Sequence, residues 1–569
     1  MAESKLGQRL ELGLVALSCL LFAASYGFNY GVDNQVVYLL KSLTLVDRGL
    51  LRADWYTSHA TQYHPTFAYL GALLLWLRRD GWAIAIAQSA IIALGTFVIY
   101  GIVRAVAGVR HALVAFWLLL AVLFVTRTSS VMVSYIFDFI LQPSTLGSLG
   151  LLGAMYYFIE ERWLASGICL AGSGAFHVNY LVLGYPVFGL AQLALGTRGL
   201  WERLKLQFGP LVLVTIAVSP MLRKSASARG LEQAQQILFS VRSPHHYSPG
   251  THERNFMPPA AYALFGIGAG WPILRSAPGK RLGALLAGFS AVVWTGTLLT
   301  TWIWVPRVAQ LFVWRFAPFA DLLNQILATS ALAQLIARPA RGKLHPPALL
   351  GACFIAVAVL GLFLKDHEDA PLPRLALAYL ALGLLVYCLD VGLDLLTQRV
   401  PERLLVRVRS VLAWAGVPFA LVALTFSARP KLQTIAERST LLNPRNDATH
   451  DLYGWLANSS PRDAIFLTPP DIEGMRLLGK RAIVVDWKAA PILPRDLLEW
   501  YARISAVTGR AVSGSRDLAG YPALSLAQVL EVAHRYGASF VVERRQHAGR
   551  LSELAVVYQN PGYIVFRMP

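Results

Sequence analysis

The stretch Gly31–Pro65, GVDNQVVYLLKSLTLVDRGLLRADWYTSHATQYHP, separates the first two apolar segments of the chain. It is polar and amphipathic, and its carboxylates include Asp33 and Asp54, together with a Trp-Tyr pair and two histidines. Asp33 comes just past the end of the first apolar segment. We therefore take this loop (residues 30–65) as the feature around which the other segments are arranged.

The composition is that of a membrane protein. Of the 569 residues, 56% are hydrophobic and 15% are charged, and the mean hydropathy is +0.50, whereas soluble proteins carry about 25% charged residues. Apolar runs long enough to span a bilayer as helices recur through residues 1–427. These runs predict a polytopic α-helical membrane domain with about 12–13 transmembrane helices.

The charge and the cysteines exclude other classes. The net charge of +19 comes from 51 Lys and Arg against 32 Asp and Glu, and positively charged loops on the inner side account for it. No basic stripe interleaved with aromatic residues indicates nucleic-acid binding. The four cysteines lie inside apolar segments, with neither a disulfide framework nor metal-ligand spacing.

The first apolar segments set the expected topology. A retained signal anchor, Leu12–Phe28, has its basic flank inside, which places the loop of Asp33 outside. Thr66–Leu77 then returns to the inner side. We expect Trp82–Val103 to re-enter the membrane and Leu164–Leu195 to form a hairpin of two short helices. The alternative is that Trp82–Val103 crosses once.

The later segments complete the membrane domain and place an outer loop at residues 222–256. The remaining predicted spans are Leu211–Met221, Ala260–Leu274, Leu282–Val305, Val308–Ile336, Leu349–Leu364, Leu375–Leu395 and Val411–Phe426.

From residue 428 the sequence turns polar, and it predicts an extracytoplasmic α/β domain over residues 428–569. Helices are expected at Asp447–Asn458, Asp471–Leu478, Arg495–Val507 and Ser525–Tyr536, and strands at Ala464–Thr468, Ala482–Asp486, Ser539–Val542, Leu554–Tyr558 and Tyr563–Arg567.

Three carboxylates are candidate catalytic groups. Asp33 would act as a general base or hold a divalent cation at the membrane surface, although an Asp at the exit of a span is also ordinary loop chemistry. Asp54 is its rival, with helix capping as the alternative role. Asp138, in YIFDFILQPSTLG, must be paired or line a wet cavity, and Gln142 follows it on the same segment.

Histidines and arginines supply candidates for binding phosphate. The outer-loop motif RSPHHY contains Arg242, His245 and His246, which suit phosphate binding, proton transfer or metal ligation, although adjacent histidines lack the spacing of a helical zinc site. A solvated loop is the alternative. His177, in FHVNY, is either a hydrogen-bonded structural residue or part of the same outer group.

Arg307 and Arg315, in WVPRVAQLFVWRF, form the last candidate pair. Either arginine would grip the phosphate of a lipid-linked donor with its planar guanidinium. Alternatively, both reach toward the membrane surface or stack on the flanking tryptophans.

Together these features resemble the GT-C class of integral-membrane glycosyltransferases. The similarity rests on Asp33 in the first outer loop, on the many spans, and on the C-terminal segment DLYGWLANSSPRDAIFLTPPDIEGMRLLGKRAIVVDWKAAP. Asp33-Asn34-Gln35, QPSTLG and RSPHHY also look like an uncharacterised bacterial membrane family near that class. The chain departs from the class in having no acidic neighbour beside Asp33, and no WWDYG-like signature is present.

The resemblance implies transfer of a sugar from a polyprenyl-phosphate donor to a glycan, lipid or protein acceptor on the outer face of a bacterial cytoplasmic membrane. Asp33 would be the base or would orient a divalent metal, and no other cofactor is implied. Arg242 or Arg315 would hold the departing phosphate, with His245 or His246 assisting. The C-terminal domain would cover the site.

A transporter or lipid flippase is the alternative function, with Asp138 and His177 lining a polar path, and an assembly scaffold is a third. The two main functions differ in space. A transferase requires Asp33, Asp138, His177, His245 and Arg315 around one outward-facing cavity, whereas a transporter requires Asp138 and His177 along a path through the bilayer.

Overall fold

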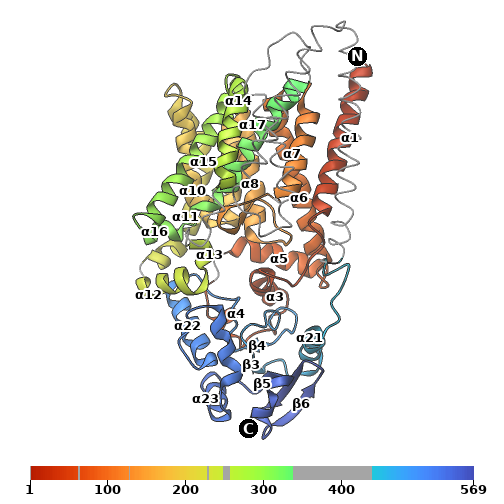
Figure 1. Cartoon of the computed structure of the whole chain (residues 1–569), viewed down its shortest axis with the longest axis vertical. Coiled ribbons are helices and arrows are strands. Elements are labelled where there is room, and N and C mark those ends of the chain that lie inside the picture. Colours follow the sequence, from red (N-terminus) through yellow and green to blue (C-terminus); the bar gives the residue numbers. More distant parts are fainter. Residues whose placement is uncertain are drawn as a thin grey trace, which may run out of the picture.

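The computed structural model describes residues 2–61, 64–126, 128–226, 230–247, 257–336, 437 and 439–569. Within these residues a bundle of long helices stands on a smaller sheet-containing domain that ends at the C-terminus (Figure 1). Several predictions fall outside the described residues. They are the domain boundary at residue 428, the outer-loop residues 248–256 and the last three predicted spans, Leu349–Leu364, Leu375–Leu395 and Val411–Phe426.

Ten long helices make up the described bundle. They are α1 (Ala2–Ala24), α6 (Trp82–Ala107), α7 (Ala112–Thr126), α8 (Pro143–Ile159), α9 (Trp163–Phe176), α10 (Val178–Ala194), α11 (Leu200–Ala226), α14 (Met257–Leu274), α15 (Ala277–Thr301) and α17 (Ala317–Ile336). Two of the described helices, α6 and α15, are long and apolar enough by length and composition to cross a membrane. The predicted total of 12–13 spans stays a prediction.

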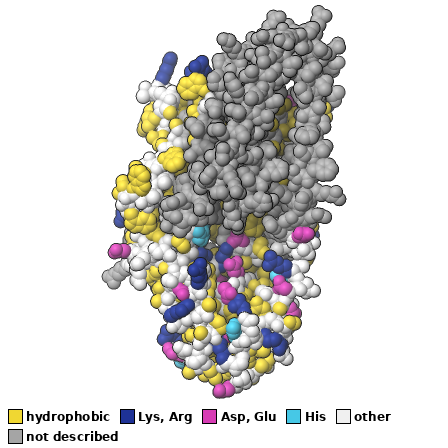
Figure 2. Space-filling model, in the orientation of Figure 1, with side chains coloured by type: hydrophobic (Ala, Val, Ile, Leu, Met, Phe, Trp, Pro, Cys, Tyr) yellow, Lys and Arg dark blue, Asp and Glu magenta, His cyan; other side chains and the backbone are white. Residues whose placement is uncertain are grey.

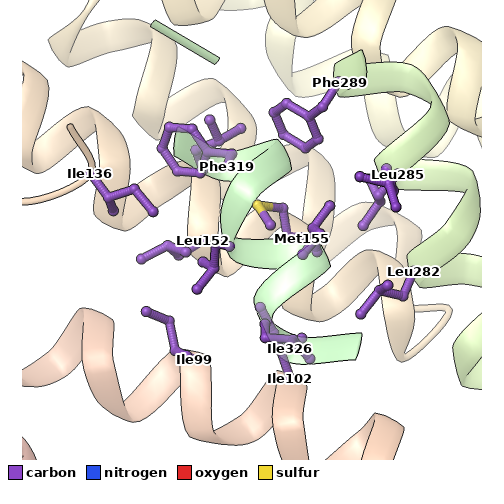
Figure 3. Close-up of a cluster of buried hydrophobic side chains, with 14 of the residues drawn as sticks. Ile99, Ile102, Ile136, Leu152, Met155, Leu282, Leu285, Phe289, Phe319 and Ile326 are labelled. Atoms are coloured by element: carbon purple, nitrogen blue, oxygen red, sulfur yellow. The ribbon is translucent and has the colours of Figure 1, made fainter. Parts of the chain in front are cut away.

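Apolar side chains hold the bundle together and also cover part of its outside. Residues of α6, α8, α15 and α17 interlock in one continuous core (Figure 3). On the outer surface, Leu21 and Leu213 are 63% and 69% exposed. Figure 2 shows apolar side chains on the described outer face of the helices and charged side chains scattered over the C-terminal domain. An apolar exterior of this kind suits a lipid environment.

Three contacts identify one end of the bundle. Tyr100 near the end of α6 donates to Glu11 of α1. Arg281 at the start of α15 pairs with Glu161, which follows α8. Gln334 at the end of α17 donates to the carbonyl of Ala107. The basic turns before α11 and α15 gather at this end, which we call the basic end, and the opposite end, which faces the C-terminal domain, is the loop end.

The expected topology of the first segments is wrong in one respect. Helix α5 (Pro65–Leu77) has 13 residues, so it is about 20 Å long, shorter than the roughly 30 Å of a bilayer core. Gly81, which follows it, packs against the Tyr30 ring so closely that no side chain fits there. Both ends of α5 therefore lie at the loop end, and α5 does not return to the basic end.

Helix α6 then runs from the loop end to the basic end as one continuous helix, so the re-entrant interpretation of Trp82–Val103 is also wrong and the single passage is right. This arrangement brings Arg104 and Arg110 to the same end as the N-terminus without a re-entrant segment. The hairpin expected at Leu164–Leu195 is confirmed, because α9 and α10 meet at His177.

The loop of residues 30–65 forms a packed layer between the bundle and the C-terminal domain. It contains three short helices, α2 (Gln35–Tyr38), α3 (Leu40–Val46) and α4 (Trp55–Ser58). Its buried apolar side chains pack against α5 on one side and against Leu477 and Ala489 of the C-terminal domain on the other. This double packing fixes the position of the loop.

The C-terminal domain contains a five-stranded sheet of order β4-β3-β5-β7-β6, in which β3 is parallel to β4 and β5, and β7 is antiparallel to β5 and β6. The elements are α21 (Ala448–Ser459), β3 (Ile465–Leu467), β4 (Ala482–Ile483), α22 (Pro494–Thr508), α23 (Leu526–Tyr536), β5 (Phe540–Arg544), β6 (Ala555–Gln559) and β7 (Tyr563–Arg567). All of them fall where a helix or strand of that type is predicted. Asp447 and Ser525 cap α21 and α23, as expected of N-terminal caps.

The helix predicted at Asp471–Leu478 is wrong, because this segment consists of turns. Its Arg476 is buried between two carboxylates. Nε lies 2.7 Å from Oδ2 of Asp54, and Nη1 pairs with Asp486. These three side chains are at most 3% exposed, so a tertiary ion-pair network decides the backbone here in place of local helix propensity.

We expect Arg476→Met to destabilise the fold by about 3–5 kcal/mol, because two buried carboxylates would then face each other without a cation. Thermal unfolding of the full chain in detergent measures the effect. Arg544→Met is the matched control, because Arg544 pairs with Asp471 at the surface and such pairs contribute about 0–1 kcal/mol. Equal shifts in the two variants would contradict the structural role of Arg476.

Candidate active site

Arg315 lies at the centre of the loop end. It belongs to a short 3₁₀ turn, η5 (Val313–Phe316), which directly precedes α17. Its guanidinium lies over the Phe312 ring, 4.9 Å from the centroid, and its Nε is buried without a hydrogen-bond acceptor. No carboxylate in the described part of the chain lies within ion-pair distance of it. Arg315 is therefore a half-buried cation that lacks an anion.

Four tyrosines surround this cation. They come from the first loop, from the segment before α8, from α10 and from the RSPHHY motif, and they are Tyr38, Tyr135, Tyr180 and Tyr247. A tyrosine hydroxyl is polar without being charged at neutral pH. The tyrosines therefore accommodate the guanidinium, yet they leave its positive charge uncompensated.

Three histidines border Arg315 and its four tyrosines, a set that we call the Arg315 group. The rings of His64 and His177 lie 5.4 Å apart between centroids, and His177 lies 4.8 Å from the Tyr180 ring. Burial, together with the smaller effect of the Arg315 charge, lowers the pKa of His64 and of His246 to about 3. His246 Nδ1 lies 3.2 Å from the carbonyl of Met132. At neutral pH these imidazoles are uncharged, so they serve as neutral hydrogen-bonding groups and not as cations for phosphate.

Asp33 faces this group from the first loop. Its backbone has φ +48°, in the left-handed region that Asp adopts more readily than most residues. Its carboxylate forms an ion pair with Lys488 of the C-terminal domain, and it is about one-third exposed. The neighbouring Asn34 donates to Oε1 of Gln142 at 3.3 Å. Lys488 thus orients the carboxylate, and the exposed part of Asp33 is open to a substrate.

Asp138 lies within a network of hydrogen bonds. Gln142 Nε2 donates to Asp138 Oδ2 at 2.6 Å and lies 2.5 Å from the hydroxyl of Tyr135. Burial raises the pKa of Asp138 to about 7, and the Asp33 carboxylate adds to this rise, while the Phe139 N–H and Arg315 oppose it. Asp138 is therefore a carboxyl group that changes its charge near neutral pH.

Arg242 connects the bundle to the C-terminal domain. It ends the π-helix η2 (Ile237–Arg242), and Nη2 donates to the carbonyl of Lys488 at 3.1 Å. Its guanidinium lies 5.5 Å from the centroid of the Trp487 ring. Its charge acts on Tyr38 and Tyr247, so it borders the Arg315 group from the side of the C-terminal domain.

The structure places most of the predicted site residues together at the loop end. Asp33, Asp138, Gln142, His177, Arg242, His245, His246 and Arg315 all lie there. Asp54 is instead held in the buried ion-pair network with Arg476, where it also caps α4. Arg307 is exposed on α16 (Pro306–Gln310). Neither residue contacts the Arg315 group.

Sequence reasoning missed Tyr38, Tyr135 and Lys488, whereas Tyr180 lies in the FHVNY motif of His177. The tyrosines lie in apolar surroundings, where an aromatic residue usually belongs to a core. Lys488 stands 455 residues from Asp33 in the chain, and nothing in its local sequence indicates such a partner. The basic residue directly after the buried AIVVDW segment was the available signal.

A divalent metal would need several oxygen or nitrogen ligands in one place. Among the described residues, no group of three or more His, Cys, Asp and Glu side chains lies close enough together to hold an ion. Lys488 pairs with Asp33 and Gln142 donates to Asp138.

The raised pKa of Asp138 makes stability depend on pH. The pKa of Asp138 in the folded state, about 7, exceeds its ordinary value of 3.8. The neutral carboxyl therefore stabilises the folded state fully below about pH 4, and this stabilisation is lost as the pH rises through about 7. Asp138→Asn keeps the neutral form at every pH. We expect its unfolding temperature, relative to the native chain, to be higher at pH 8.5 than at pH 5.

Thermal unfolding of Asp138→Asn and of the native chain between pH 5 and pH 8.5 measures the difference between their unfolding temperatures. Asp463→Asn, at an exposed position, is the control and should show no such pH dependence. A constant difference between Asp138→Asn and the native chain would mean that Asp138 does not titrate in this range.

Comparison with known proteins places this arrangement in a known fold. Residues 447–507 match the family model of a domain of unknown function (DUF6798), and no curated protein matches the sequence significantly. The structure is similar to the crystal structure of ArnT from Cupriavidus metallidurans bound to undecaprenyl phosphate, with a TM-score of 0.50, 13% identity, and 98% of each chain covered.

Two further solved structures are less similar. The apo state of the same ArnT has a TM-score of 0.46 at 12% identity, over 99% of this chain and 98% of that one. The archaeal oligosaccharyltransferase AglB from Archaeoglobus fulgidus, in complex with an inhibitory peptide and a dolichol-phosphate, has a TM-score of 0.43 at 11% identity, over 95% and 70%. The likeness to ArnT is one of fold, and the sequence-based expectation of a fold of this kind agrees with it.

Proposed function

We propose that the chain is a membrane glycosyltransferase that moves a sugar from a polyprenyl-phosphate donor to an acceptor at the outer face of the membrane. The observation that carries this proposal is Arg315, a half-buried guanidinium without an anionic partner in the described residues. It lies in the same group as Asp33, Asp138 and Arg242. An anionic substrate therefore has a prepared position beside a carboxylate.

The phosphate of a lipid-linked sugar fits Arg315 for two reasons. An uncompensated buried charge is costly, and a phosphate removes that cost. The guanidinium also matches phosphate oxygens in a bidentate arrangement, which a lysine does not offer. The apolar exterior of the helices offers a surface for the polyprenyl chain. The similar fold of ArnT, solved with undecaprenyl phosphate bound, supports the same class of donor.

The reaction requires one proton acceptor and one leaving-group site. A hydroxyl oxygen of the acceptor attacks the anomeric carbon of the donor sugar, and the bond from that carbon to the phosphate oxygen breaks. The polyprenyl phosphate departs with the electron pair and is stabilised by Arg315, with Arg242 at the rim. Asp33 takes the hydroxyl proton, because its carboxylate is oriented by Lys488 and partly exposed.

The placement in the membrane follows from the charges. The basic end of the bundle, with the N-terminus, would face the cytoplasm under the positive-inside rule. The loop end and the C-terminal domain would then lie outside, in the manner of an enzyme of a bacterial cytoplasmic membrane. The active site would open where a lipid-linked donor and an extracytoplasmic acceptor meet.

The competing function, a transporter or flippase, needs Asp138 and His177 along a path through the bilayer. Both residues lie at the loop end with Asp33 and Arg315, and His177 occupies the turn between α9 and α10. The position of both residues at one end of the bundle, and not along a path through it, favours the transferase.

Loss of the central guanidinium should weaken donor binding. We expect Arg315→Gln to bind undecaprenyl phosphate roughly tenfold to a hundredfold more weakly, because a charge-assisted contact is lost. Native mass spectrometry of the detergent-solubilised protein measures the binding. Arg307→Gln is the matched control, because Arg307 is an exposed arginine on the neighbouring turn. Equal binding by the two variants would refute the assignment of Arg315.

Loss of the base should stop transfer without affecting the donor. We expect Asp33→Asn to lower the rate of undecaprenyl phosphate release from undecaprenyl-phosphate-linked sugars by about 10²–10⁴, the range for a positioned general base. Native membranes supply the acceptor, and donor binding should stay within twofold of the native chain. Lys488→Gln should reduce the rate less, because Lys488 orients the base and does not accept the proton. Retained transfer in Asp33→Asn would overturn the role of Asp33.

A further inference from the structure

A polar cavity lies beside Arg242, between the bundle and the C-terminal domain. It has a volume of about 470 Å³, within the roughly 300–1,000 Å³ of small-molecule sites. One wall is the segment around η2 and α13 (Pro244–Tyr247), and the other belongs to the C-terminal domain. The lining residues that matter below are Arg242, His245, Trp487, Gly514, Arg516 and Asp517.

The cavity carries an excess of positive charge. Asp517, its single acidic lining residue, accepts hydrogen bonds from the backbone and hydroxyl of Ser513 and forms a 3.0 Å ion pair with Arg510, which lies outside the lining. Arg516 is exposed and makes no ion pair within the described residues. With Asp517 neutralised, Arg516 leaves the cavity cationic, and Arg242 adds a second guanidinium to the lining.

An aromatic wall accompanies these charges. Trp487 is partly exposed in the cavity, where the Arg242 guanidinium lies over its ring and Trp500 packs against it at an interplanar angle of 52°, with 5.3 Å between the ring centroids. The exposed part of this fixed indole suits an apolar edge of a sugar ring, while the arginines suit an anionic substituent on that ring. Serine hydroxyls and a histidine in the same lining suit the sugar hydroxyls.

We propose that this cavity binds one sugar ring of the acceptor, and that the ring carries a carboxylate or a phosphate group. The proposal rests on the proposed function and specifies its acceptor. The cavity differs from the donor site, since half of its wall comes from the C-terminal domain and its rim at Ser513 and Arg516 is exposed to water. A water-facing site of this kind suits an extracytoplasmic glycan.

The cavity is also connected to the reacting carboxylate. Trp487 forms its wall, and the next residue, Lys488, pairs with Asp33. Arg242 lines the cavity and donates to the carbonyl of Lys488. A ring bound against Trp487 therefore lies next to the groups that position Asp33, so a neighbouring hydroxyl of the acceptor can approach the base.

The test uses the full chain in nanodiscs and saturation-transfer NMR with three probes: glucuronate, glucose 6-phosphate and glucose. We expect the two anionic sugars to bind and glucose to bind roughly tenfold more weakly. Gly514→Tyr should block binding, because Gly514 has an extended backbone and open space around its Cβ position, so a side chain fills the cavity without strain. Arg516→Glu should weaken the anionic sugars roughly tenfold and leave glucose unchanged.

Matched controls separate the cavity from general surface effects. Gly454→Tyr places the same side chain on the exposed face of α21, where its Cβ also meets nothing, and Arg535→Glu reverses an exposed charge on α23. Both should bind the anionic sugars as the native chain does.

The outcomes distinguish this inference from the proposed function. Binding of undecaprenyl phosphate without any binding of the anionic sugars would overturn the acceptor site and leave the donor site intact. Equal binding of glucose and the anionic sugars, or binding that survives Gly514→Tyr, would also overturn it. Binding of the anionic sugars without undecaprenyl phosphate would support the cavity and refute the transferase.

Discussion

The guanidinium of Arg476, buried between Asp54 and Asp486, is the interaction on which the arrangement of the site depends. It joins the first loop to the C-terminal domain across 422 residues of chain. The backbone N–H of Ile483 and that of Ala489 add hydrogen bonds to the same two carboxylates. Because all these groups are removed from water, a small displacement would leave charges unpaired, and the interface therefore has one low-energy geometry.

The ion pair of Arg476 also fixes the positions of three consecutive residues, Asp486, Trp487 and Lys488. Asp486 is fixed by Arg476, so the next two side chains are fixed as well: Trp487 forms the wall of the cationic cavity, and Lys488 reaches Asp33. One short segment after β4 thereby connects the structural ion pair, the proposed acceptor cavity and the proposed base, Asp33. The C-terminal domain in this way contributes residues to the proposed active site.

The loop end also concentrates backbone conformations that L-residues rarely adopt. Asp33, Met132 and Phe312 all have φ between +47° and +56°. Asp33 is the proposed base, the carbonyl of Met132 lies within hydrogen-bond distance of His246, and the Phe312 ring lies beneath Arg315. Such conformations persist where surrounding contacts over-determine them. Here the packing of the first loop and of η5 supplies those contacts and directs polar groups toward one place.

The sequence by itself determined the features that depend on composition and on neighbouring residues. Apolar runs predicted the helical bundle, and the helix and strand patterns after residue 428 predicted the elements of the C-terminal domain, because each signal is local in the chain. Asp33 was predicted in the loop after the first apolar segment, where it lies, whereas the predicted span Val308–Ile336 is broken at η5, and this break places Arg315 at the loop end.

Tertiary structure alone decided the rest. Helix α5 looked like a span, but the packing of its two ends keeps it at the loop end. Asp54 looked like a rival base, but a guanidinium far along the chain makes it structural. Lys488 and the four tyrosines around Arg315 came into the site by contacts between distant segments. The physical reason is that hydropathy and local propensity fix what each segment is, whereas ion pairs and packing between distant segments fix what it touches.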